Sequence, residues 1–232
     1  MHVLEAAELL VLWERGATRH ALDRSALLSA CARPELSAQA LADLPLGDVT
    51  AALLSLREAQ FGTRIDCHFD CPACGQRLEL VLRTHELMQP AANATATIAV
   101  AGLELRALTL RDLAAVAHEH DAARAACMLL QRCTLRGDTQ ALDAAALREV
   151  EDGLEALDPS ADLAFSVHCA ACGEEGTAQL DAGVLLWDEI DAHARALLAE
   201  VHALAAAYGW SESEILALSP ARRAAYLSLV QA

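Results

Sequence analysis

The chain has 232 residues, enough for one large domain or two small ones with a sizeable core. Its formal net charge of −16 argues against nucleic-acid binding, which needs clustered Lys and Arg, and against docking on an anionic membrane. The sequence has neither an apolar run long enough for a membrane-spanning helix nor the basic region of a signal peptide. We therefore expect a cytoplasmic protein whose eight cysteines stay reduced as thiols or metal ligands.

Ala and Leu dominate the composition, and aromatic residues make up only 3% of it. Both are strong helix formers without β-branching, so they favour a mostly α-helical α+β fold. In the first 62 residues, helical spacing predicts helices over residues 4–13 and 23–31. A turn over residues 44–48 precedes a third helix, for which Asp48 is the expected N-cap, and Gly62 ends it.

The middle of the chain mixes β-favouring and helical segments. Two such β-favouring stretches flank the turns Cys71-Pro72-Ala73-Cys74-Gly75 and Cys169-Ala170-Ala171-Cys172-Gly173. Between them we expect a break at residues 90–93, then a hairpin over residues 95–108. A helix capped by Thr109 and Asp112 should continue through residue 130, and another should span residues 139–157.

The last 50 residues contain the clearest helical pattern. Apolar residues follow the i, i+3, i+4 spacing from Trp187 to Tyr208, and Gly209 ends the helix. Ser211 and Glu214 form a capping box for a short helix, and Pro220 opens the last one.

Each cysteine turn has the spacing of a zinc knuckle, in which two sulfurs point at one position and a following glycine permits positive φ. Together the turns supply four thiolates, the full tetrahedral shell of one structural Zn²⁺. We predict its ligands as Cys71, Cys74, Cys169 and Cys172. Since four thiolates close the shell, the zinc should be structural rather than catalytic.

The two knuckles are far apart, with 94 residues between Cys74 and Cys169. The interpretation is a split zinc ribbon in which two β-hairpins share one ion around an inserted α/β subdomain. The predicted parts are an N-terminal helical part (1–62), the split zinc ribbon (63–89 and 160–182), the insertion of a hairpin and helices (90–159) and a C-terminal helical part (183–232).

Alternatives to a single four-cysteine site stay open. A redox Cys-x-x-Cys would need one pair beside a βαβ pattern, which the sequence lacks. Two separate metal sites could instead draw on Cys67, His68 or His168 as additional ligands. His118-Glu119-His120 resembles a metal or acid–base cluster, but its spacing is that of a solvated helical face.

Nothing in the sequence predicts an active site, and we expect no enzyme. Cys31, Cys127 and Cys133 lie in apolar helical stretches and are expected to be small core residues. Three of the eight aromatic residues gather in the tail, at Tyr208, Trp210 and Tyr226. They form either a C-terminal mini-core or a candidate docking surface for a partner helix.

Several stretches carry a resemblance to a known family. They are Leu12-Trp13-Glu14-Arg15-Gly16, Phe61-Gly62, the two cysteine turns, Leu108-Thr109-Leu110-Arg111-Asp112-Leu113, Asp158-Pro159-Ser160-Ala161-Asp162, Leu186-Trp187-Asp188-Glu189-Ile190, and the tail from Glu200-Val201-His202 through Tyr208-Gly209-Trp210 to Arg222-Arg223. The chain resembles the small zinc-knuckle proteins of contractile phage tails and extracellular contractile injection systems, known as T-even-type baseplate hub assembly chaperones or baseplate proteins.

The resemblance implies a bacterial cytoplasmic protein that helps assemble a phage-tail-like baseplate or its central hub. Its expected partners are hub, spike or tape-measure proteins, and no catalytic residue carries over. Whether the protein leaves as a chaperone or stays in the particle as a structural component is not implied. A stand-alone zinc-dependent regulator or enzyme is the remaining hypothesis.

Overall fold

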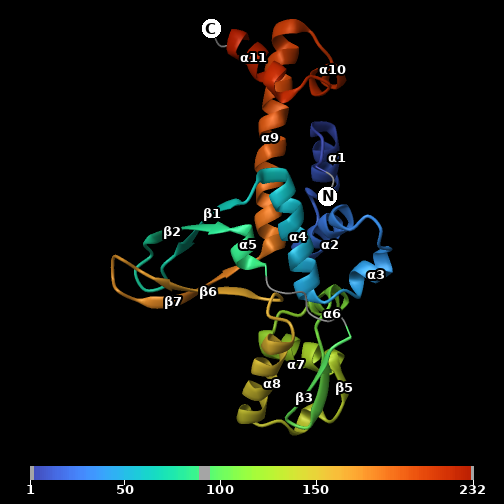
Figure 1. Ribbon diagram of the computed structural model, residues 1–232, viewed down its shortest axis with the longest axis vertical. Coiled ribbons are helices and arrows are strands. Elements are labelled where there is room, and N and C mark those ends of the chain that lie inside the picture. Colours follow the sequence, from blue (N-terminus) through green and yellow to red (C-terminus); the bar gives the residue numbers. More distant parts are fainter. Residues whose placement is uncertain (1–2, 89–94, 231–232) are drawn as a thin grey trace.

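A computed structural model of the protein describes residues 3–88 and 95–230 (Figure 1). The fold is mixed α+β and mostly helical, as the Ala- and Leu-rich composition predicts. The expected break at residues 90–93 lies outside the described residues.

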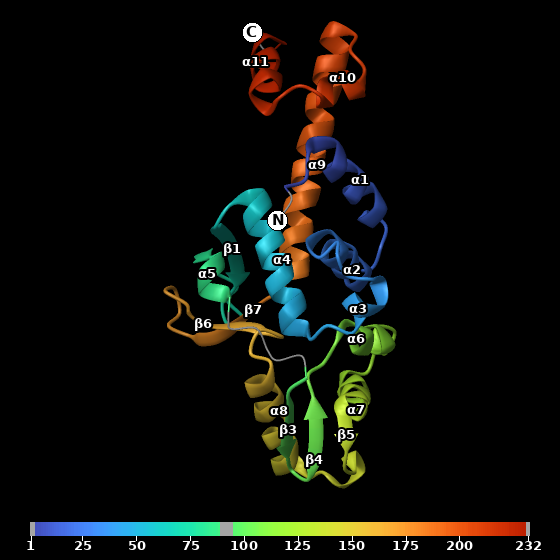
Figure 2. The ribbon, with the colours of Figure 1, turned by 45° about the vertical axis from the view of Figure 1, so that its right-hand side comes forward.

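Helix α9 (Ala182–Tyr208) runs along the long axis of the molecule from the C-terminal helices to its middle (Figures 1 and 2). Helices α1 (Ala6–Gly16), α2 (Ala21–Ala32) and α4 (Leu46–Phe61) pack around its first half. Its apolar stripe supplies the centre of the main core through Leu186, Ile190, Ala194 and Leu197. The sequence pattern predicted this helix and its end at Gly209, which has φ 71° and closes the last turn.

Polar contacts fix the neighbouring helices to α9. The Trp13 indole Nε1–H of α1 donates to Asp191 Oδ1 at 2.7 Å. The Trp187 ring covers Gly16 so closely that a Cβ at Gly16 would overlap it, which explains why glycine ends α1. Arg57 of α4 is bonded to Glu189 of α9 through two nitrogens.

The start of α4 corrects a prediction. The helix already begins at Leu46, after Pro45, so Asp48 lies in its first turn and is not the N-cap. The carboxylate of Asp158 reaches this helix end instead, and its Oδ2 accepts from the Gly47 N–H at 2.9 Å. A short helix, α3 (Ala38–Ala42), which the sequence analysis did not predict, precedes this turn.

Two antiparallel hairpins project side by side from the helical body (Figure 1). The first pairs β1 (Arg64–Asp70) with β2 (Arg77–Arg83) and leads into α5 (Thr84–Leu87). The second pairs β6 (Leu163–His168) with β7 (Glu175–Leu180). The roots of both hairpins join the main core, which contains Ile65 and Leu163.

A second unit lies at the opposite end of the molecule from the C-terminal helices (Figure 2). Its sheet has the order β3 (Thr97–Val100), β4 (Leu103–Arg106) and β5 (Thr134–Arg136). Helix α7 (Ala122–Cys133) and helix α8 (Ala144–Leu157) pack with this sheet around a separate core. The buried members of that core are Leu103, Leu105, Leu130, Cys133 and Val150.

The predicted hairpin of this unit is confirmed, and two helical predictions need correction. Helix α6 (Leu110–Val116) does not run on into α7, because Asp121 caps a new helix. Residues 139–157 are likewise not one helix: a 3₁₀ turn, η1 (Thr139–Ala141), comes first, and Asp143 caps α8. Strand β5 was not predicted, since it has only three residues. The four-part division of the chain stays a prediction.

The C-terminal helices lie at the far end of α9 (Figure 1). The predicted capping box of Ser211 and Glu214 is confirmed at the start of α10 (Glu212–Leu216), and α11 (Pro220–Val230) begins at the predicted proline. In the part of the chain that the structure describes, no helix has the length and apolar character needed to cross a membrane.

Candidate metal centre

The first cysteine pair forms the turn at the tip of the β1–β2 hairpin. The Cys71 N–H donates to the Gln76 carbonyl at 2.9 Å, and the Gly75 N–H donates to the Cys71 carbonyl at 2.8 Å. Gly75 has φ 70°, a conformation that glycine adopts at no steric cost. The turn therefore needs the glycine that follows the second cysteine.

The second pair repeats this geometry at the tip of the β6–β7 hairpin. The Cys169 N–H donates to the Glu174 carbonyl at 2.9 Å, and the Gly173 N–H donates to the Cys169 carbonyl at 2.8 Å. Gly173 has φ 75°. Ala170 occupies the position of Pro72 in the first turn without changing these bonds, so proline is not needed for the knuckle geometry.

The two tips bring all four sulfurs together. Cys71 Sγ lies 3.7 Å from Cys172 Sγ, and Cys74 Sγ lies 3.7 Å from Cys169 Sγ, so each contact crosses between the hairpins. All four Sγ atoms lie within 4.8 Å of one another. Four sulfurs about 2.3 Å from one ion at the corners of a tetrahedron would be about 3.8 Å apart. The cluster therefore has the size of a four-thiolate shell and could bind a metal ion.

Burial differs between the first and second cysteine of each turn. Cys71 and Cys169 are 3% and 1% exposed, whereas Cys74 and Cys172 are exposed. The N–H groups of Cys172 and Ala171 lower the pKa of Cys169 to about 7. The Glu174 N–H lowers the pKa of Cys172, but the thiols of Cys74 and Cys169 outweigh it and raise the value to about 12. Sulfurs this close resist becoming anions together unless a cation shares their charge.

The additional ligands considered from the sequence do not belong to this cluster. Among the described residues, the ligand atoms that come together are those of the four cysteines, without Cys67, His68 or His168. Cys67 lies within β1, and its thiol donates to the Leu80 carbonyl at 3.6 Å. The carbonyls of Gln76 and Glu174, which close the two turns, were missed by the sequence analysis. Their shared position directly after a knuckle glycine would have been the signal.

The other candidate residues are dispersed. Cys133 is buried in the second core and Cys31 is half-buried against the main core, as expected, but Cys127 is exposed on α7. The prediction that Cys127 is a core residue is therefore wrong. His118 and His120 are exposed in the turn between α6 and α7, and not on a helical face.

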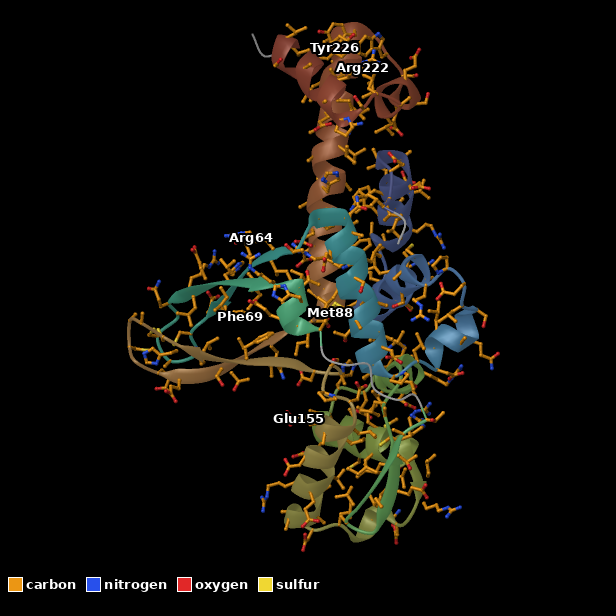
Figure 3. All side chains as sticks on the ribbon, in the orientation of Figure 1. Arg64, Phe69, Met88, Glu155, Arg222 and Tyr226 are labelled. Carbon is orange, nitrogen blue, oxygen red and sulfur yellow. The ribbon has the colours of Figure 1, made fainter. Side chains whose placement is uncertain are left out.

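The three aromatic residues of the tail contact one another. Tyr208 stacks on Trp210 with ring centroids 4.7 Å apart, and Tyr226 meets both rings edge-on at 5.7 and 4.9 Å. Tyr226 lies at the far end of α9 from the hairpin residues Arg64 and Phe69 (Figure 3). Since Tyr208 is still 39% exposed, the cluster joins α9 to α11 and also presents a ring to solvent.

The fold and the site together define a mostly helical protein in which two hairpins bring together four cysteines that could bind a metal ion. Comparisons with protein-family models, with curated proteins and with solved structures find no match.

Proposed function

We propose that the cluster holds one structural Zn²⁺ and that the two hairpins form a split zinc ribbon. The observation that carries this is the pair of 3.7 Å Sγ–Sγ distances between hairpins, which suit a tetrahedral shell. Four thiolates in this arrangement favour zinc or iron. Elemental analysis of purified protein should give one zinc per chain. A chain without metal, or one with the visible absorption of an iron–thiolate centre, would reject the zinc assignment.

We further propose that the protein is a non-catalytic assembly chaperone or adaptor for the baseplate or hub of a contractile injection system. The support is the resemblance, together with where its residues lie. Trp13 contacts Asp191 of α9, Trp187 covers Gly16, and the two knuckles bring the four cysteine sulfurs together. Several of the stretches that carry the resemblance thus hold parts of the fold together.

A closed shell supports a non-catalytic role. A catalytic zinc needs a coordination position for water or substrate, and four cysteine ligands leave none. A stand-alone regulator or enzyme would instead bind nucleic acid or show hydrolysis, and the net charge of −16 opposes the first of these. Assays of the zinc-loaded protein for both activities should be negative.

The function is tested by affinity capture of the tagged chain from bacteria that carry a contractile injection cluster. Capture should recover hub, spike or tape-measure proteins, and recovery of none of them rejects the proposal. Quantitative mass spectrometry of purified particles then separates the two roles. A chaperone is absent from finished particles, whereas a structural baseplate component is present in a fixed ratio.

A further inference from the structure

A cleft of about 760 Å³ lies between the two hairpins, beside the metal centre. The strand residues that line it belong to β2 and β6. Those used below are Arg77, Leu78, Glu79, Leu80, Ser166 and His168. Because β2 pairs with β1 and β6 pairs with β7, the two strands that border the cleft are not paired with each other.

The register shows which peptide groups of β2 are not hydrogen-bonded to β1. The Cys71 N–H donates to the Gln76 carbonyl, so these residues form a hydrogen-bonded pair. Such pairs alternate with non-bonded ones along an antiparallel ladder. Arg77 and Glu79, opposite Asp70 and His68, are therefore in non-bonded pairs. Their N–H and C=O groups point away from β1.

The same reasoning applies to β6. The Cys169 N–H donates to the Glu174 carbonyl, which makes 169 and 174 a hydrogen-bonded pair. Ser166 and His168 are then in non-bonded pairs with Thr177 and Glu175. Their peptide groups point away from β7. The residues with outward peptide groups on both strands are thus among those that line the cleft.

The side chains of β2 that line the cleft alternate between apolar and charged. Leu78 and Leu80 are half-buried on one face, whereas Arg77 and Glu79 are exposed on the other. A row of outward N–H and C=O groups is satisfied by an extended chain, because a helix has already used its own peptide groups. Opposite charges are preferred directly across a strand pair.

We propose that the β2 edge of this cleft binds an extended polypeptide segment of a partner protein as an added β-strand. The segment places apolar side chains level with Leu78 and Leu80 and a basic residue opposite Glu79. The β6 edge forms the other wall of the cleft. This inference does not depend on the injection-system function, since any partner with such a segment satisfies it.

The test uses the full chain with its metal and a displayed library of random ten-residue peptides. Selection should enrich segments in which apolar and polar residues alternate. Synthetic copies of the enriched peptides should lose at least tenfold in affinity for the Glu79→Pro variant, whose outward N–H is removed without breaking a bond to β1. His68→Pro is the matched control, because His68 lies opposite Glu79 but on the far edge.

Two further measurements test whether the outward N–H groups themselves account for binding. Glu79→Gln, which keeps the N–H, should retain most of the affinity. Two peptides are also compared, one N-methylated at the odd-numbered residues and one at the even-numbered residues. Only one of these two sets of N–H groups faces β2, so one peptide should lose binding and the other should keep it. Equal binding by Glu79→Pro and His68→Pro, or no enriched peptide, overturns the proposal. It is also overturned if the chain dimerises and Glu79→Pro abolishes the dimer, because a second copy is then the occupant.

Discussion

The guanidinium of Arg57 in α4 bonds the carboxylate of Glu189 in α9, with Nε–Oε2 at 2.9 Å and Nη2–Oε1 at 2.6 Å. The Arg57 side chain is only 4% exposed, and it also donates to the Gly62 carbonyl where α4 ends. One buried cation thus joins the end of a helix to a neighbouring helix more than a hundred residues away in sequence. Removing one partner of such a buried ion pair destabilises the protein, because the other charge is left buried without a partner.

Removing the Arg57 side chain should therefore destabilise the protein clearly. Arg57→Ala leaves Glu189 and the Gly62 carbonyl without their donor, and we expect a loss of about 3 kcal/mol in the free energy of unfolding. Urea denaturation measures it. Arg111→Ala is the matched control, because Arg111 makes the same kind of paired contact with Asp43 at an exposed site. A near-equal effect of the two substitutions would show that burial of Arg57 is not what matters.

The proposed zinc site makes a second prediction. Cys71→Ser should abolish binding of one zinc and lower the midpoint of thermal unfolding by about 10 °C or promote aggregation, because metal binding contributes folding free energy. Cys169→Ser should behave alike. Cys67→Ser and Cys127→Ser should retain the metal, since neither sulfur belongs to the cluster. Wild-type stability in Cys71→Ser would refute the split zinc ribbon.

The buried carboxylate of Asp112 predicts a pH dependence. Burial alone would raise the pKa of Asp112, but hydrogen bonds from Arg106 and Thr109 outweigh it and lower the value to about 2. A carboxyl whose pKa is lower in the folded state stabilises the fold above its unfolded pKa, and this stabilisation is lost as pH falls towards 2. The lowered pKa corresponds to a contribution of about 2 kcal/mol to the free energy of unfolding at neutral pH.

Comparison of Asp112→Asn with the wild type tests this. The variant should be less stable at pH 7, and the difference should shrink as the pH falls from about 4 towards 2. Chemical denaturation of both proteins across this range gives the two free energies. A difference that is constant with pH would mean that the charge of Asp112 does not contribute.

The aromatic cluster at the end of α9 gives a fourth prediction. Tyr208 is both in ring contact with Trp210 and 39% exposed, so Tyr208→Ala should weaken capture of the proposed baseplate partners if the tail is their docking surface. Val184→Ala is a control on the same helix, since Val184 is 44% exposed near the other end of α9. Unchanged capture with lowered thermal stability would assign the three rings to a mini-core alone.

Local sequence signals predicted many elements correctly because their causes are local. The capping box at Ser211, the end of α9 at Gly209 and the knuckle turns at Gly75 and Gly173 depend on residues at most a few positions apart. The same local reasoning was wrong at the start of α4, because the residue that caps this helix is distant in sequence. There the capping carboxylate is Asp158, 111 positions from Gly47, so Asp48 was chosen in error.

The sequence by itself determined that the chain is mostly helical and that two Cys-x-x-Cys-Gly turns exist, because helical spacing and turn geometry are properties of short segments. Only the tertiary structure decided that Cys71 meets Cys172 and Cys74 meets Cys169 across two hairpins. It also decided that Cys67, His68 and His168 lie outside the cluster. The paired knuckles predicted that the four sulfurs come together, as they do. Which sulfur of one hairpin contacts which sulfur of the other depends on how the hairpins are anchored in one core, and no local pattern records that.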